Sequence, residues 1–385
     1  MNPYWSIPSM ILYISLGLVS MCAVIDVKRK ELKSRIKYNS VAFMVWFAIW
    51  LVFAVWRKVD IGVGGSDAIT YVQYFNDCLN PGLNTLYAQH LDKGFQLLTK
   101  LIRVFIYDYH GYFIIIYGII IACYQRFVYE LTPTNVYYEP MVLLFFIFLR
   151  GYSTLRTNIS IAFLLMALVA CYKKEYKKVA VYVILSFGMH IASLLYIAFF
   201  LFYYIYEKKR LSFKQGLYLY IAALVGAKVV QSVLMKMTGL RGAYSSYASK
   251  SLNTSFFDDG WKIAFGQLLL LALMIVFRKS IKRVVVNFSA INKSRYQFVY
   301  KLCFYDFLMI PVCYILGIWR GYEYFYIPRL IMWGVLMKGV LSHFNSTSKI
   351  IVRILFLVLF IAWMIFRVFN TYESSALMPY VLDIF

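Results

Sequence analysis

Arginine, histidine, carboxylate and tyrosine side chains near the ends of apolar segments are the groups best placed to do chemistry in this sequence. Other chemistries lack support, because the chain has no Walker A pattern and no DxD, HExxH or GxSxG motif. The four histidines show no metal-ligand spacing. We therefore expect no metal, nucleotide or other cofactor. The candidate residues are Arg57, Asp67, Tyr71, Tyr74, Arg150, Arg156, His190, Arg320 and Arg329.

Helices in a membrane must position these side chains. Of the 385 residues 62% are apolar and only 15% are charged, although the net charge is +23. A nucleic-acid-binding protein with this excess would carry charge on about a quarter of its residues, so we expect no nucleic-acid partner. At roughly 20 apolar residues per span, the chain has room for about ten to twelve spans. We predict an all-α polytopic membrane protein, with residues 1–385 forming a single integral membrane domain.

Twelve apolar segments predict about twelve transmembrane helices. Residues 1–8 lack the basic region and cleavage site of a secretory signal, so we expect the first segment to be retained as a span. Two stretches, 138–172 and 179–206, could each form either a hairpin or one kinked helix. The segments are 9–26, 40–56, 111–129, 138–150, 155–172, 179–189, 190–206, 215–234, 263–277, 297–318, 327–342 and 350–369.

The basic residues indicate the topology, since cytoplasmic loops collect Lys and Arg. Four short loops carry 20 of the 40 basic residues. They share one side only if 179–206 is a hairpin, for which Gly188 is the expected break. If 138–172 is a similar hairpin with its turn near Gly151, the four basic loops stay on one side of the membrane. Both termini are then predicted to be external. The loops are 28–37, 173–178, 208–214 and 278–295.

Two predicted external loops are long enough to contain folded structure of their own. In the first, 57–110, Ser66 is the expected N-cap of one helix. A second helix near 93–105 would place Phe95, Leu98, Ile102 and Phe105 on one side. We expect these amphipathic helices to lie in the interface or to re-enter the membrane. The other loop, 235–262, is rich in Ser, Tyr, Asn and Gly.

Four stretches within about residues 57–195 resemble the EpsG-like polysaccharide polymerases, which belong among the Wzy-type membrane glycosyltransferases. Two departures occur: Asp92 stands where that family usually has Glu, and Thr157 where it commonly has Gln. Asp92 keeps the carboxylate of that Glu but carries it on a shorter side chain. The stretches are Gly65-Ser66-Asp67 followed by Tyr71 and Phe75; Asp92-Lys93-Gly94-Phe95 followed by Leu97 and Leu98; Leu155-Arg156 opening a span; and His190 to Ser193 with the following Leu194.

The resemblance implies that repeat units carried on undecaprenyl diphosphate are joined into a capsular, exo- or O-antigen polysaccharide at the outer face of a bacterial cytoplasmic membrane. Its expected partners are that lipid-linked oligosaccharide, membrane lipids, and the chain-length regulator and flippase of the same pathway. Because the donor is already activated, neither nucleotide nor ATP is required. The reaction needs cations for a departing diphosphate, a base for the acceptor hydroxyl and a surface for two saccharides.

Arginine suits a diphosphate, because its guanidinium stays protonated and donates paired hydrogen bonds. For Arg150 and Arg156 the structural alternative is an interfacial side chain that reaches toward water. Arg320 and Arg329 frame a loop that could equally be an aromatic belt with two anchors. Arg57 follows a Trp at the end of a span, which is typical of an interfacial anchor.

The other candidates also have structural alternatives. His190, with Ser193 one helical turn later, could be a buried histidine bonded to a backbone carbonyl. Asp67 could act as a base or bind a sugar, or it could only stabilise a helix N-terminus. Tyr71 and Tyr74 could stack on sugars or pack the loop. In the motifs of the resemblance, Asp92 and Ser193 are further expected substrate-binding residues.

The mechanistic hypothesis is that Arg156, aided by Arg150 or Arg320, holds the donor diphosphate. His190 or Asp67 then takes the proton from the acceptor hydroxyl, and direct displacement inverts the anomeric centre. Two alternatives stay open. One is a flippase for lipid-linked oligosaccharides, which should show two related halves or charges along a central path. The other is a membrane acyltransferase that modifies sugars.

Overall fold

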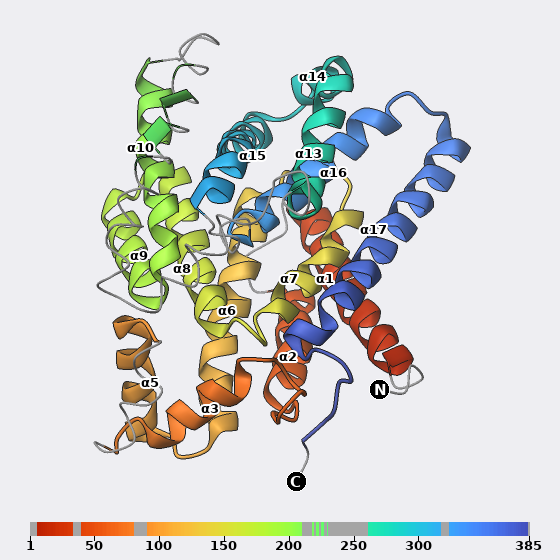
Figure 1. The fold of residues 1–385 in the computed structure, drawn as a ribbon. Helices are drawn as coiled ribbons and strands as arrows, with labels where there is room; N and C mark the ends of the chain where they lie inside the picture. Colours follow the sequence, from red (N-terminus) through yellow and green to blue (C-terminus); the bar gives the residue numbers. More distant parts are fainter. Residues whose placement is uncertain are drawn as a thin grey trace.

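The computed structural model describes residues 6–33, 40–80, 91–209, 261–316 and 323–383, with isolated positions between 218 and 229. This part of the chain contains fourteen α-helices and two short 3-10 helices (Figure 1). Four of its helices are long and apolar enough to cross a membrane. The protein is therefore all-α and has the helices of a multi-pass integral membrane protein. The four are α1 (Ser6–Leu32), α6 (Tyr109–Leu131), α8 (Leu155–Tyr172) and α17 (Ser346–Ser375).

Helices occupy eleven of the twelve predicted apolar segments, and the other segment, 215–234, lies largely outside the described residues. An apolar segment in lipid favours a helix, because only a helix satisfies its backbone polar groups internally. The total number of spans stays a prediction. The remaining elements are α2 (Val41–Val55), α3 (Ala68–Asp77), α5 (Lys93–Phe105), η2 (Glu139–Leu143), α7 (Leu144–Arg150), α9 (Tyr176–Met189), η3 (Ile191–Ser193), α10 (Leu194–Lys209), α13 (Trp261–Val276), α14 (Arg278–Val286), α15 (Ala290–Leu316) and α16 (Tyr326–Leu341).

The two stretches that could each form a hairpin or one kinked helix, 138–172 and 179–206, both reverse the direction of the chain. In the first, α7 ends at Arg150 and α8 begins at Leu155, so the break near Gly151 is confirmed. In the second, α9 runs through the expected break at Gly188 and ends at Met189, where the predicted segment also ends, because His190 has an extended backbone (φ −157°, ψ 123°). The chain then returns in α10. Rings of Tyr172, at the end of α8, and of Tyr203, in α10, both contact Phe298.

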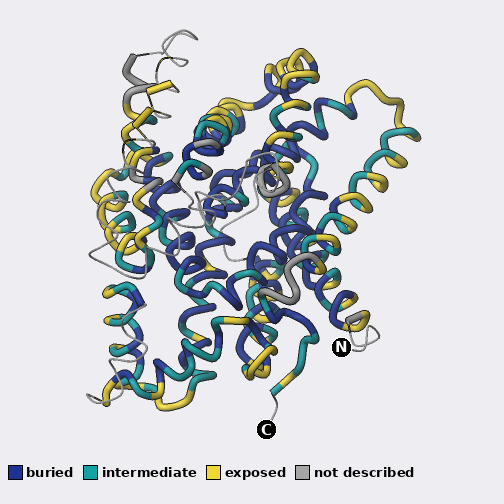
Figure 2. Tube along the Cα trace, in the orientation of Figure 1, coloured by how far each residue is buried: buried dark blue, intermediate teal, exposed yellow. Residues whose placement is uncertain are grey.

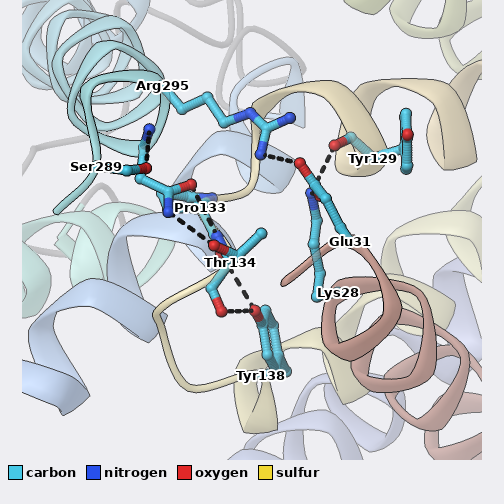
Figure 3. A network of polar contacts seen from close by, with 9 residues as sticks. Lys28, Glu31, Tyr129, Pro133, Thr134, Tyr138, Ser289 and Arg295 are labelled. Carbon is cyan, nitrogen blue, oxygen red and sulfur yellow. Dashed lines mark hydrogen bonds and ion pairs between the residues drawn. The ribbon is translucent and has the colours of Figure 1, made fainter. Parts of the chain in front are cut away.

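Buried charges tie one end of the bundle together (Figure 3). Lys28 Nζ donates to the Tyr129 carbonyl at 2.6 Å and pairs with Glu31 at 2.7 Å. Arg295 Nη1 reaches the other oxygen of Glu31 at 2.6 Å, which joins α15 to α1. Lys173 pairs with Glu130 at this end as well. Three of the four predicted basic loops therefore contribute to one end of the molecule, called the basic end below.

The opposite end is built from the residues that connect α2 to α6 and from the C-terminal segment. Residues 375–383 run along the loop 56–67: Ser66 N donates to the Ser375 carbonyl at 2.8 Å, and Asp383 N to the Trp56 carbonyl at 2.8 Å. Helix α1 begins toward this end and the described C-terminal segment finishes there (Figure 1), and Tyr380 N donates to Ser9 Oγ at 2.9 Å. We call this the loop end; that it faces outward stays a prediction.

The two amphipathic helices of the predicted external loop lie at the loop end. The first, α3, begins at Ala68 with Asp67 at its N-cap, so the expectation of a Ser66 cap is wrong by one residue. In α5 the predicted face is largely confirmed, since Phe95 and Ile102 are buried. Phe105 is instead 81% exposed, because the helix ends there. The second predicted loop, 235–262, lies almost entirely outside the described residues.

Burial varies across the bundle as expected for a protein in lipid (Figure 2). Buried side chains gather where α1, α2, α6, α7, α8 and α16 pack, and Trp46, Trp50 and Tyr124 are fully buried there. Only 11% of the apolar span of α17 is buried, and its exposed apolar side chains are Ile, Leu, Val and Phe. An apolar helix face of this kind is stable when lipid covers it.

Candidate functional site

Asp92 joins three segments at the loop end. Its Oδ2 lies 2.9 Å from Arg156 Nη1 and 3.2 Å from His190 Nδ1. The Ile191 backbone N–H donates to its other oxygen at 3.4 Å. All three side chains are mostly buried, with exposed fractions of 20% for Asp92, 17% for Arg156 and 14% for His190. Three motif stretches that are far apart in the sequence therefore meet at one carboxylate.

A glycine in α5 allows this approach. A Cβ atom added to Gly94 in α5 would lie 2.5 Å from the carbonyl oxygen of Gly188 in α9. The two helices can therefore touch backbone to backbone only while that position is glycine. This contact brings Asp92, immediately before α5, to His190, immediately after α9. At Gly188 itself an added Cβ atom would lie 3.6 Å from the Gly94 Cα, an ordinary contact, so the close approach depends on Gly94.

Arg156 is also bounded by residues of α3. The Tyr71 hydroxyl accepts a hydrogen bond from its guanidinium, and the Asp67 carboxylate is close enough to act on it electrostatically. Tyr71 in turn packs edge-on against Phe95 of α5, with ring centroids 5.5 Å apart. The structure therefore brings five predicted residues into one group, called the Asp92 cluster: Asp67, Tyr71, Asp92, Arg156 and His190.

The electrostatics of the cluster keep its central carboxylate ionised. Burial raises the pKa of Asp92, but the hydrogen bond from His190 and the nearby His190 and Arg156 side chains lower it more, so the net shift is downward. An ionised carboxylate accepts the Nδ1–H of an imidazole and fixes that tautomer. His190 Nε2 is then the nitrogen that can accept a proton.

Arg57 lies apart from this cluster and is only 1% exposed. Its guanidinium donates to the carbonyls of Gly64 and Ala54 and to the Tyr117 hydroxyl, and it stacks on three aromatic rings. Every side of the group is occupied by the protein. We therefore assign Arg57 a structural role in holding the loop 56–67, inside the protein and not at the interface.

Two other arginines are paired with acids that sequence reasoning missed. Arg150 forms an ion pair with Glu323, and both line a small pocket with Asn158. Arg329 Nε lies 2.7 Å from Asp306 Oδ2, and this pair is almost fully buried. Two acids in the sequence could have indicated these pairs. Glu323 is the one acid in the predicted aromatic loop, and Asp306 lies within a predicted span. Such an acid is expensive in a membrane unless it has a partner.

The remaining predicted residues are Tyr74, Ser193 and Arg320, and of these the structure assigns a packing role only to Tyr74. Tyr74 is fully buried, and burial raises the pKa of its hydroxyl to about 12, so it packs the loop. Ser193 is buried next to the cluster, and its Oγ has no hydrogen-bond partner among the described residues. Arg320 lies outside the described residues. No group of three or more His, Cys, Asp or Glu side chains that could hold a metal ion occurs in the part of the chain that the structure describes.

Comparison with known proteins gives one match. A profile described as the EpsG family matches residues 13–382, which is nearly the whole chain and extends well beyond the motif stretches of residues 57–195. No curated protein and no solved structure shows a significant match.

Proposed function

Because the chain belongs to the EpsG family, we propose that it is a membrane glycosyltransferase that joins lipid-diphosphate-linked oligosaccharide repeat units into a polysaccharide. The proposal includes undecaprenyl diphosphate as the carrier and the outer face of a bacterial cytoplasmic membrane as the place. One observation carries it: the Asp92 cluster unites the motif residues at a single end of the bundle.

In the proposed reaction, His190 is the general base. Its Nε2 removes the proton of the acceptor hydroxyl while that oxygen attacks the anomeric carbon of the donor. The new glycosidic bond forms as the bond from the anomeric carbon to the diphosphate breaks, and the lipid diphosphate leaves with the electron pair. Attack opposite the leaving group inverts the anomeric centre. The Asp92 contact favours His190 over Asp67 for this role.

Arg156 has two functions in this proposal. It binds Asp92 and so fixes the carboxylate that orients His190. Its guanidinium also stabilises negative charge at the reacting end of the donor, where a fixed cation acts most strongly in a site that excludes water. The arrangement needs no metal or nucleotide, because the donor already carries its leaving group.

The experiment is a polymerisation assay in membranes with Arg156→Ala and His190→Ala at matched expression. We expect each to reduce chain extension by about 100-fold or more, the usual effect of losing an acid–base or charge-stabilising group. His110→Ala is the matched control, since His110 lies at the same end but contacts Asp108 and Asp383 instead. Long chains at normal yield from both variants would contradict the assignment of this site.

A further inference from the structure

Helix α14, at the basic end, carries four cationic side chains on one exposed face. They lie at the first, second, fifth and sixth positions of the helix, which places them within about 140° of one another around its axis. In the part of the chain that the structure describes, none of the four side chains forms an ion pair or a hydrogen bond. They are Arg278, Lys279, Lys282 and Arg283.

Protein contacts occupy the opposite face of α14. Ser280 Oγ lies 2.6 Å from Nε2 of His343, which follows α16. A Cβ atom added to Gly339 in α16 would lie 3.0 Å from Ile281 Cγ1, so the two helices pack closely there. Because this face is held by α16, the cationic face points away from the bundle. The buried side chains are Ser280, Ile281, Val284 and Val285.

No acid near α14 in the sequence balances its charge. Residues 260–305 contain eight Lys and Arg residues and no Asp or Glu. The buried cations of the basic end differ in this respect, because Lys28 and Arg295 share Glu31. The cations of α14 are therefore available to a partner outside the chain, and a surface with this excess attracts an anionic one.

Exposed apolar side chains border the cationic face on both sides. Helix α13 ends at Val276, two residues before Arg278, and both Ile275 and Val276 are exposed. At the other end of α14, Val286 and Ile291 are exposed as well. Such side chains are stable against lipid tails, whereas Lys and Arg beside them extend to the headgroups. The cations of α14 therefore lie where a membrane surface would meet the protein.

We propose that the cationic face of α14 binds the headgroups of anionic phospholipids in the leaflet at the basic end. The apolar border favours a lipid over an acidic soluble protein, because a lipid also covers apolar surface. This inference concerns the attachment of the protein to its bilayer and does not rest on the proposed polymerase function.

The chemistry of the four side chains suits a phosphodiester headgroup such as that of phosphatidylglycerol. Arginine donates paired hydrogen bonds to phosphate oxygens, and lysine acts as a point charge. Each cation near an anionic membrane surface favours association by about 5-fold. This attraction falls off within about 10 Å in 0.1 M salt, so it is sensitive to ionic strength.

The test measures which lipids gather at α14 in the full-length protein in nanodiscs. A fluorophore is attached to the Val286→Cys variant in a Cys22→Ser background, because Cys22 is exposed and the other cysteines are buried. Phosphatidylglycerol or phosphatidylcholine with a nitroxide on its acyl chain serves as the quencher, at equal mole fractions. We expect quenching to indicate a local enrichment of phosphatidylglycerol of about 5-fold or more, which falls toward equality in about 1 M salt.

Exposed substitutions locate the effect. Lys279→Gln/Lys282→Gln should remove most of the preference, whereas Lys279→Arg/Lys282→Arg keeps both charges and should retain it. Lys174→Gln/Lys177→Gln is the matched control. These two lysines are exposed near the start of α9, apart from α14 (Figure 1), and their loss should leave the preference unchanged.

Two results would overturn the proposal. Equal quenching by the two lipids at low salt would exclude anionic lipid as the occupant and point instead to an acidic protein. A preference that Lys279→Gln/Lys282→Gln leaves intact would assign the lipid to another surface. The measurement uses neither donor nor acceptor, so its outcome is independent of whether the protein extends a polysaccharide.

Discussion

At the residue scale, Asp92 organises the candidate site. It contacts an arginine and a histidine from other segments, and its carboxylate is ionised because these partners outweigh burial. Motif resemblance identified Asp92, Arg156 and His190 separately. Their contact could not be predicted, because it depends on how α5 packs against α9 through Gly94 and Gly188. Sequence patterns give the residues of such a cluster but not the pairs within it.

The Asp92 carboxylate can be tested directly. We expect Asp92→Asn to lower polymerisation by about 100-fold, because a neutral amide neither pairs with Arg156 nor orients His190 through a charge. Asp92→Glu, which restores the residue usual in the resembling family, should keep substantial activity. The two variants share a fold and differ in charge, so equal activities in a membrane polymerisation assay would contradict this role.

The lowered pKa of Asp92 also predicts a pH dependence of stability. A carboxyl whose folded pKa is below its unfolded value, about 3.9, stabilises the protein above that value and loses this effect as the pH falls through the folded pKa. The difference in thermal stability between wild type and Asp92→Asn should therefore be constant from pH 8 to about pH 5 and shrink below about pH 4. A difference that shrinks between pH 7 and pH 5 would argue against the downward shift.

At the element scale, the C-terminal segment holds the loop that carries Asp67. Residues 375–383 bind the loop 56–67 through backbone hydrogen bonds, and the Ser153 hydroxyl, between α7 and α8, donates to the carbonyl of Ser375. This segment was not predicted, because it has neither the apolar length of a span nor a helical period. By contrast, every apolar helix in the described residues was predicted, since composition alone determines which segments are stable in lipid.

Gly65 is a position of this loop where substitution should be costly. It has a φ of +117°, and a Cβ atom there would lie 2.3 Å from the Tyr152 carbonyl oxygen. Gly62 also has a positive φ, +76°, but nothing lies within 4 Å of its Cβ position. We expect Gly62→Ala to cost about 1 kcal/mol and Gly65→Ala clearly more, because only the latter adds a clash to the strain. Thermal unfolding of the purified variants measures this, and equal costs would argue against the close contact.

At the scale of the whole molecule, charge is divided between the two ends. Buried pairs such as Lys28–Glu31 and Arg295–Glu31 close the basic end, whereas the Asp92 cluster and the C-terminal segment 375–383 lie at the loop end. The sequence predicted this division from the clustering of Lys and Arg in short loops. It could not predict that Arg329 pairs with Asp306 inside the bundle, because two charges in different spans have no fixed relation in the sequence.

The division predicts the membrane orientation. By the positive-inside rule, the basic end faces the cytoplasm. Single cysteines placed near Arg29 or Lys282 should be protected from an impermeant thiol reagent in intact cells, and a cysteine near Asp77 should be labelled. The reverse labelling pattern would place the Asp92 cluster on the cytoplasmic face and contradict an outward-facing polymerase.

The most direct test of the central claim is the lipid-linked material that accumulates in a strain lacking this protein, together with the face of the membrane on which it is exposed. A polymerase predicts single repeat units on their lipid carrier at the outer face, and their extension into long chains when the wild-type gene, but not His190→Ala, is restored. The same units confined to the inner face would indicate a flippase, and polymer of normal length that lacks acyl groups would indicate an acyltransferase. Either result would contradict the account given for the Asp92 cluster.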